Sequence, residues 1–75
     1  MDNQPSDPMD AYHACRNGKL PHLEAQAIIA AATTGDPAYA AYYMAYYHDS
    51  DRVWAENVIA RATTGDPADV AYKMV

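Results

Sequence analysis

Four side chains of this 75-residue sequence could act as nucleophiles, proton-transfer groups or metal ligands: His13, Cys15, His22 and His48. A nucleophilic cysteine needs a histidine beside it to take its proton. His13 and Cys15 are two positions apart, and on a helix this spacing puts them on different sides. No segment around them matches a known serine–histidine or cysteine–histidine arrangement. We therefore expect no catalytic residue, because an enzyme would need a pocket that holds at least two of these four side chains.

A second segment, HDSD at His48 to Asp51, places one imidazole and two carboxylates close together in the chain. It lacks the glycine and the terminal glutamate of a calcium-binding loop. We therefore interpret it as a polar turn that caps the following helix. Cys15 is interpreted as a small apolar residue of the first helix, since free cysteine packs like one. The sequence thus predicts no metal and no cofactor.

The helices that carry these residues are marked by a repeat, ATTGDPA, which occurs at residues 32–38 and again thirty positions later at 62–68. Glycine suits the left-handed position that ends a helix, aspartate caps the next helix, and proline is tolerated at its first position. A fixed period of this length is typical of stacked supersecondary units. We expect an all-α fold of antiparallel two-helix repeats, either a truncated α-solenoid or a compact bundle. The expected elements are a disordered tail at residues 1–6 and a single repeat domain at 7–75, with helices at 8–17, 21–33, 37–48, 51–63 and 67–75.

The composition narrows the classes of function. The formal net charge is −5, which argues against direct binding to nucleic acid. One cysteine allows no internal disulfide. The first residues lack the basic and apolar segments of a signal peptide, and no apolar run approaches the roughly 18 residues of a membrane span. We therefore expect a cytoplasmic protein, in a bacterial host cell if it is encoded by a phage, without a membrane partner.

The two copies of the repeat differ, and the differences predict which side chains face water. Positions that are charged in one copy should be exposed in both; in the helix expected at 21–33 these are His22, Gln26 and Ala31, aligned with Arg52, Glu56 and Arg61. Positions that stay apolar should form the buried stripe of an amphipathic helix. They are Leu23, Ala25, Ile28, Ile29 and Ala32, with Val53, Ala55, Val58, Ile59 and Ala62 as counterparts.

The same comparison applies to the segment 39–54, which holds five of the seven tyrosines and the single tryptophan. Tyr39 and Tyr43 align with Asp69 and Lys73 and should be substantially exposed, whereas Tyr42 and Tyr72 align with each other and should fill the core. Trp54 aligns with Glu24 and should lie at or near the surface. Exposed tyrosine and tryptophan dominate binding hot spots because they bring large contact areas at low entropic cost. We therefore predict a partner-binding patch of Tyr39, Tyr43, Tyr46, Tyr47 and Trp54.

Most acidic side chains have a structural explanation. Seven of the ten lie at or in the first turn of an expected helix, where they satisfy free amides and complement the helix dipole: Asp7, Asp10, Asp36, Asp49, Asp51, Asp66 and Asp69. Asp7, Asp36 and Asp66 would also line one rim of the stack, where a basic groove of a partner could bind them as a mimic of nucleic acid; plain helix capping is the alternative. The residues predicted to steer the protein toward a basic surface are Asp36, Asp49, Asp51, Asp66 and Asp69.

The segments TTGDPAYAAY and TTGDPADVAY share the pattern T-G-D-P-x-x-x-A-Y. This pattern resembles α-helical repeats of phage and bacterial proteins of unassigned function, and it covers residues 20–75. By size and acidity alone, the chain is similar to anti-CRISPR proteins and other small host-takeover inhibitors of phages. The resemblance implies a non-enzymatic inhibitor that covers a surface of a larger nucleic-acid-binding protein. The alternative is a structural repeat module that forms a homodimer through the same patch.

Overall fold

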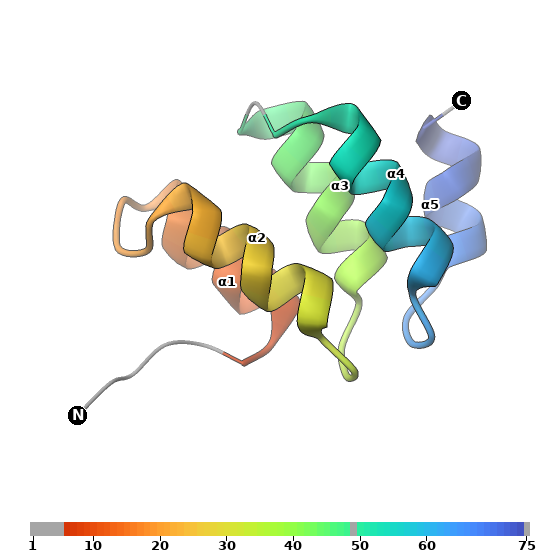
Figure 1. Ribbon diagram of the computed structural model, residues 1–75, viewed down its shortest axis with the longest axis horizontal. Coiled ribbons are helices and arrows are strands. Elements are labelled where there is room, and N and C mark those ends of the chain that lie inside the picture. Colours follow the sequence, from red (N-terminus) through yellow and green to blue (C-terminus); the bar gives the residue numbers. More distant parts are fainter. Residues whose placement is uncertain (1–5, 49, 75) are drawn as a thin grey trace.

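A computed structural model describes residues 6–48 and 50–74, which form five α-helices (Figure 1). They are α1 (Pro8–Arg16), α2 (His22–Ala31), α3 (Pro37–Tyr47), α4 (Arg52–Arg61) and α5 (Pro67–Met74). The predicted all-α class is confirmed, and these described ranges contain no strand. Helices α1 to α4 end one or two residues before their predicted ends, and the predicted end of α5, residue 75, lies outside the described residues. In α2 and α4 the C-caps Ala32 and Ala62 already have an extended ψ of 135°. The tail predicted at 1–6 lies outside the described residues except for Ser6.

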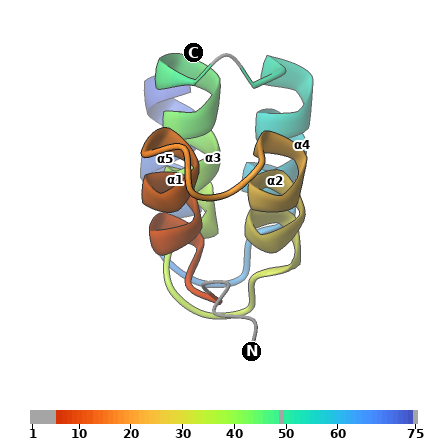
Figure 2. The ribbon, with the colours of Figure 1, turned by 90° about the vertical axis from the view of Figure 1, so that its left-hand side faces the viewer.

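The helices form two layers (Figure 2). α1, α3 and α5 make one layer, and α2 and α4 make the other. α3 lies at the centre and packs against all four other helices. α2 and α4 begin and end at positions thirty residues apart, and α3 and α5 begin thirty residues apart. The repeat in the sequence is therefore a repeat in the structure, within a compact helical bundle.

The predicted starts of α1, α3 and α5 are confirmed, whereas α2 and α4 begin at His22 and Arg52, one residue later than predicted. The Asp7 carboxylate accepts hydrogen bonds from the amides of Met9 and Asp10 at 3.1 and 3.2 Å. Asp36 accepts from the amide of Tyr39 at 3.2 Å. A proline occupies the first turn directly after each of these caps, where its missing N–H costs nothing.

The three glycines have positive φ angles of 76°, 72° and 77°, but they occupy two different structural positions. Gly18 directly follows the C-cap of α1, where the amide of Lys19 bonds to the carbonyl of Ala14 at 2.8 Å, as in a Schellman motif. Gly35 and Gly65 were predicted at the same kind of helix end, yet each lies three residues beyond the C-cap. There Gly35 packs on Asp7 and Pro8, and Gly65 packs on Asp36. The turn that contains each of these two glycines therefore packs on the N-terminal cap of an earlier helix, α1 for Gly35 and α3 for Gly65.

The core is built from small side chains. Six alanines are buried, and the largest fully buried side chains are Ile29, Met44, Val70 and Pro8. Within the predicted stripe of α2, Ala25 and Ile29 are buried and Ile28 is half-buried. Small residues on these faces let the helices approach closely.

The prediction that Leu23 and Val53 are buried is wrong, because they are 76% and 61% exposed. Each lies two residues before a buried alanine, Ala25 or Ala55. Two residues turn an α-helix by about 200°, so their side chains point away from the core. Their conserved apolar character between the two copies therefore does not reflect burial.

Candidate functional site

A tyrosine cluster covers the outer side of α3 and reaches α1. We call it the tyrosine surface; it consists of Tyr39, Tyr42, Tyr43, Tyr46 and Tyr47 from α3 and of Tyr12 from α1, which is itself buried, with 3% exposure, and packs against Tyr43. The opposite side of α3 is buried through Ala40, Ala41 and Met44. Because residues three and four apart share a helix face, five tyrosines at this spacing form one continuous aromatic surface.

Ring contacts link the whole tyrosine surface. The ring centroids of Tyr42 and Tyr46 are 4.5 Å apart, and those of Tyr43 and Tyr47 are 5.5 Å apart. Tyr12 joins from α1, with its ring centroid 5.4 Å from that of Tyr43. These separations and tilted arrangements are typical of favourable aromatic pairs. The rings therefore hold one another in place.

Exposure rises along α3 toward its C-terminal end. Tyr46 and Tyr47 are 52% and 66% exposed. Tyr39 and Tyr43 are half-buried against the core, which is less exposure than predicted. The reason is that α3 is the central helix of its layer, so that α1 and α5 cover part of each ring. Tyr42, predicted to be core, is also only half-buried.

Tyr39 is fixed by α5. Its hydroxyl donates a 2.7 Å hydrogen bond to the Asp69 carboxylate. This bond, with partial burial and the negative charge of Asp69, raises the pKa of Tyr39 to about 12. Asp69 also lies 3.9 Å from the Lys73 ammonium group. Asp69, which was predicted to steer the protein toward a basic surface, therefore already interacts with Tyr39 and Lys73 within the molecule.

A groove of about 460 Å³ runs between α1 and α3. Its aromatic walls are Tyr12, Tyr43 and Tyr47, and its polar rim is His13 and Arg16. The sequence comparison missed Tyr12 and Arg16, because α1 has only a partial counterpart in the repeat. The groove therefore combines aromatic walls with a guanidinium group.

Trp54 and the predicted steering acids Asp36, Asp51 and Asp66 are not among the residues that line the groove. Trp54 is half-buried on α4, in the other layer, and within residues 6–48 and 50–74 no ring contact joins it to the tyrosine surface. Asp51 and Asp66 accept hydrogen bonds from the amides of Val53 and Asp69, each at 3.3 Å. Asp36 also acts as a cap, and Asp49 falls outside the described residues. Helix capping is thus observed for Asp36, Asp51 and Asp66, while a steering role stays a prediction.

The prediction that Tyr72 fills the core is wrong, because its side chain is 81% exposed. It lies on α5, where only Val70 and Met74 are buried. Tyr42 touches Tyr39 and Tyr46, whereas the same position of α5 has no tyrosine three or four residues away. The aligned tyrosines therefore have different surroundings.

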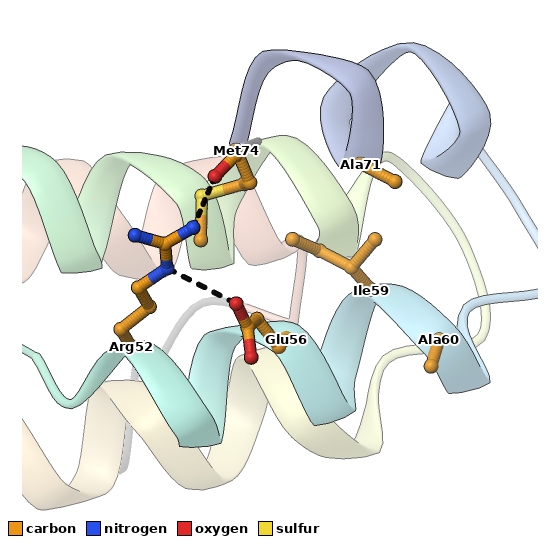
Figure 3. A pocket seen from close by; sticks show the side chains of 6 residues that line it. All are labelled: Arg52, Glu56, Ile59, Ala60, Ala71 and Met74. Carbon is orange, nitrogen blue, oxygen red and sulfur yellow. Dashed lines mark hydrogen bonds and ion pairs between the residues drawn. The ribbon is translucent and has the colours of Figure 1, made fainter.

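A shallow pocket of about 260 Å³ opens between α4 and α5 (Figure 3). The Arg52 guanidinium donates to the Glu56 carboxylate at 3.0 Å and also to the carbonyl of Met74. Ile59, Ala60 and Ala71 supply its apolar wall. Because its charged groups are paired with each other, this pocket offers less for recognition than the α1–α3 groove.

A polar cluster lies where α1 ends, α2 begins and α3 ends. Cys15, His22 and His48 each place a sulfur or nitrogen atom within 4.8 Å of the others. His22 Nε2 is 3.0 Å from the Ser50 hydroxyl, which also accepts a 3.0 Å hydrogen bond from the Gln26 amide. Burial raises the pKa of the Cys15 thiol. The structure thus brings together three of the four side chains of which an enzyme would need at least two in one pocket, although none of these three lines the α1–α3 groove or the α4–α5 pocket.

This cluster corrects the sequence prediction that His22 and Gln26 point outward. Both are half-buried, because the turn after α3 packs on the start of α2. Their counterparts Arg52 and Glu56 are exposed and bond to each other across one helical turn. The two copies of the repeat therefore present different surfaces at matching positions.

Comparison of the chain with protein-family models, with curated proteins and with solved structures finds no match. Among the described residues, none of the helices has both the length and the apolar character needed to cross a membrane.

Proposed function

We propose that the protein is a non-enzymatic binding module that docks on a larger protein through the tyrosine surface. The observation that carries this proposal is the α1–α3 groove, where Tyr12, Tyr43 and Tyr47 stand beside Arg16. Tyrosine and arginine are enriched among the residues that dominate binding energies. A tyrosine also has only two side-chain torsions to immobilise on binding.

The groove suggests the chemistry of the partner. An aromatic or long apolar side chain of the partner would lie in the groove against the tyrosine rings, and a carboxylate next to it would pair with Arg16. The chain as a whole carries a charge of −5, so a basic surface around that anchor would speed association. A small acidic inhibitor that covers a site on a nucleic-acid-binding protein is the concrete form of this function.

The rings are organised before binding, which supports a role in recognition. Tyr43 is held between Tyr12 and Tyr47, and Tyr39 is held by Asp69. Preorganised groups lose less entropy when a complex forms. Truncation of Tyr47 should therefore weaken a complex by at least tenfold, since hot-spot truncations cost about 2 kcal/mol or more.

Site-specific photo-crosslinking tests this proposal. A photoreactive phenylalanine analogue replaces Tyr47 in one variant and Tyr72 in a matched control, because Tyr72 is exposed on α5 and lies outside the tyrosine surface. Position 47 should crosslink a defined larger protein, an excess of wild type should compete, and Tyr43→Ala should compete at least tenfold less well. Equal crosslinking from both positions, or full competition by Tyr43→Ala, would refute the proposal.

Sedimentation equilibrium separates the structural alternative. The same tyrosine surface would fit a second copy of the chain, and a homodimer would crosslink position 47 to itself. A monomer at micromolar concentration together with a heterologous crosslink supports the binding module. A tight dimer that dissociates in the Tyr47→Ala variant would refute the binding module and would support the self-assembling structural module.

A further inference from the structure

Three potential metal ligands from three helix ends converge on one point, although the sequence separates them by up to 33 positions. Cys15 comes from the last turn of α1, His22 is the first residue of α2, and His48 is the C-cap of α3. Their ligand atoms lie within 4.8 Å of one another. We propose that Cys15, His22 and His48 bind a zinc ion, a site that does not depend on the proposed function.

The three ligand atoms lie near one another, although farther apart than around a bound ion. Zinc bonds of about 2.0–2.1 Å to nitrogen and about 2.3 Å to sulfur place tetrahedral ligand atoms roughly 3.3–3.6 Å apart. The rings of His22 and His48 are nearly parallel, with an angle of 19° and centroids 5.4 Å apart. The three ligand atoms must therefore move closer together, and one ring must turn, because the in-plane lone pairs of two stacked rings cannot both point at one ion.

The backbone that carries these ligands is well anchored. The amides of His48 and Ser50 both donate to the carbonyl of Met44, at 3.1 and 3.0 Å. The Cys15 carbonyl accepts a 3.0 Å bond from the amide of Gly18, which fixes the turn that leads to His22. Ligands on anchored elements keep their spacing without the metal, which favours tight binding.

Hydrogen bonds around the cluster match those of metal-binding histidines. Such histidines usually donate their second ring N–H to a nearby oxygen, which fixes the tautomer and the orientation of the ring. His22 Nε2 is 3.0 Å from the Ser50 hydroxyl, and Gln26 donates to the same oxygen at 3.0 Å. In the proposed site, the Ser50 hydroxyl accepts the Nε2 proton of His22, and His22 offers Nδ1 to the ion. Ser50 is itself buried, with 7% exposure.

The donor set selects the class of metal. One thiolate and two imidazoles suit zinc, whereas calcium and magnesium prefer carboxylate and carbonyl oxygens. Cys15 is buried, and His22 and His48 are half-buried, so an ion can enter from the histidine side. Coordination replaces the thiol proton, which leaves to solvent, and a water molecule completes the fourth position.

A competition titration with Zn²⁺ alone, against a chromophoric chelator in the presence of a non-thiol reductant, tests the site. Wild type should bind one ion, and Cys15→Ala and His48→Gln should each weaken binding at least 100-fold. Ser50→Ala should weaken it by about 10–100-fold. His13→Gln is the matched control, because this exposed histidine of α1 lies outside the cluster, and its affinity should equal that of wild type.

Cobalt substitution gives a second readout. Co²⁺ in wild type should produce a thiolate charge-transfer band and the intense visible bands of tetrahedral coordination, and the charge-transfer band should vanish in Cys15→Ala. Circular dichroism establishes that each variant is folded, and His48→Gln carries the test if Cys15→Ala does not fold. The proposal is overturned if wild type binds no Zn²⁺ at micromolar concentration. It is equally overturned if His13→Gln loses as much affinity as the cluster variants.

Discussion

The three glycines provide an internal test of how the repeat units dock. All three have φ angles between 72° and 77°, so alanine at any of them costs roughly 1–2 kcal/mol of backbone strain. A Cβ at Gly18 would meet no atom within 4 Å. A Cβ at Gly65 would lie 2.8 Å from the Cα of Asp36 and still closer to its carboxyl group. Gly18→Ala and Gly65→Ala therefore introduce the same backbone strain, but only Gly65→Ala also disturbs the contact between repeat units.

The expected losses follow from this difference. Gly18→Ala should lower the free energy of unfolding by about 1 kcal/mol through strain alone. Gly65→Ala should lower it by about 2–4 kcal/mol, because crowding of the Asp36 backbone adds about 1–3 kcal/mol. Gly35→Ala should fall between them, since its Cβ would crowd mainly the Asp7 side chain and Pro8 Cδ, the latter at 3.0 Å.

Urea unfolding followed by far-UV circular dichroism measures these losses. A domain of this size holds only roughly 3–5 kcal/mol of stability, so all four proteins are compared at one concentration of a stabilising osmolyte. Equal destabilisation by Gly18→Ala and Gly65→Ala would refute the reasoning. In that case the positive φ, and not the packing of this turn against Asp36, would be the reason for glycine at position 65.

Three further predictions follow from burial and hydrogen bonding. Met44→Ala should cost about 2–5 kcal/mol of unfolding free energy, while Leu23→Ala, at a side chain 76% exposed, should change it by less than about 0.5 kcal/mol; thermal unfolding distinguishes them. Because the pKa of Tyr39 is raised to about 12, stability from its bond to Asp69 should be present at neutral pH and lost as the pH rises from about 10 to about 12. Unfolding curves across that range should show a larger loss for wild type than for Tyr39→Phe, and parallel curves would contradict it. Ser50→Ala should cost about 1–3 kcal/mol in urea unfolding, because His22 and Gln26 lose their partner in a buried site.

Local chemistry explains why the helices could be predicted. Aspartate caps, proline at the first turn and glycine in the left-handed region act on the residues beside them, so the starts of α1, α3 and α5 were found at their observed positions. Helix ends were less accurate: Ala32 and Ala62 leave the helix before the glycine. The reason lies outside the local sequence, because Gly35 and Gly65 must reach the preceding unit.

Comparison of the two copies predicted side-chain environments less well. The comparison assumes that aligned positions have the same neighbours. This assumption fails at His22 and Gln26, whose side chains both contact the Ser50 hydroxyl. Their counterparts Arg52 and Glu56 form an ion pair with each other instead. The assumption fails again at Tyr72, which lacks the neighbouring rings that surround Tyr42. The tyrosine-rich character of the surface was visible in the sequence, whereas Tyr12 and Arg16 were not recognised as part of it.

The sequence by itself determined that residues 6–48 and 50–74 form five helices, that three of them begin at Pro8, Pro37 and Pro67, and that one unit recurs after thirty residues, because capping and backbone preferences act over a few neighbouring residues. Only the tertiary structure decided that Cys15, His22 and His48 meet, and that Tyr12 and Arg16 line a groove with Tyr43. Those contacts join different helices, so they depend on how α1, α2 and α3 pack.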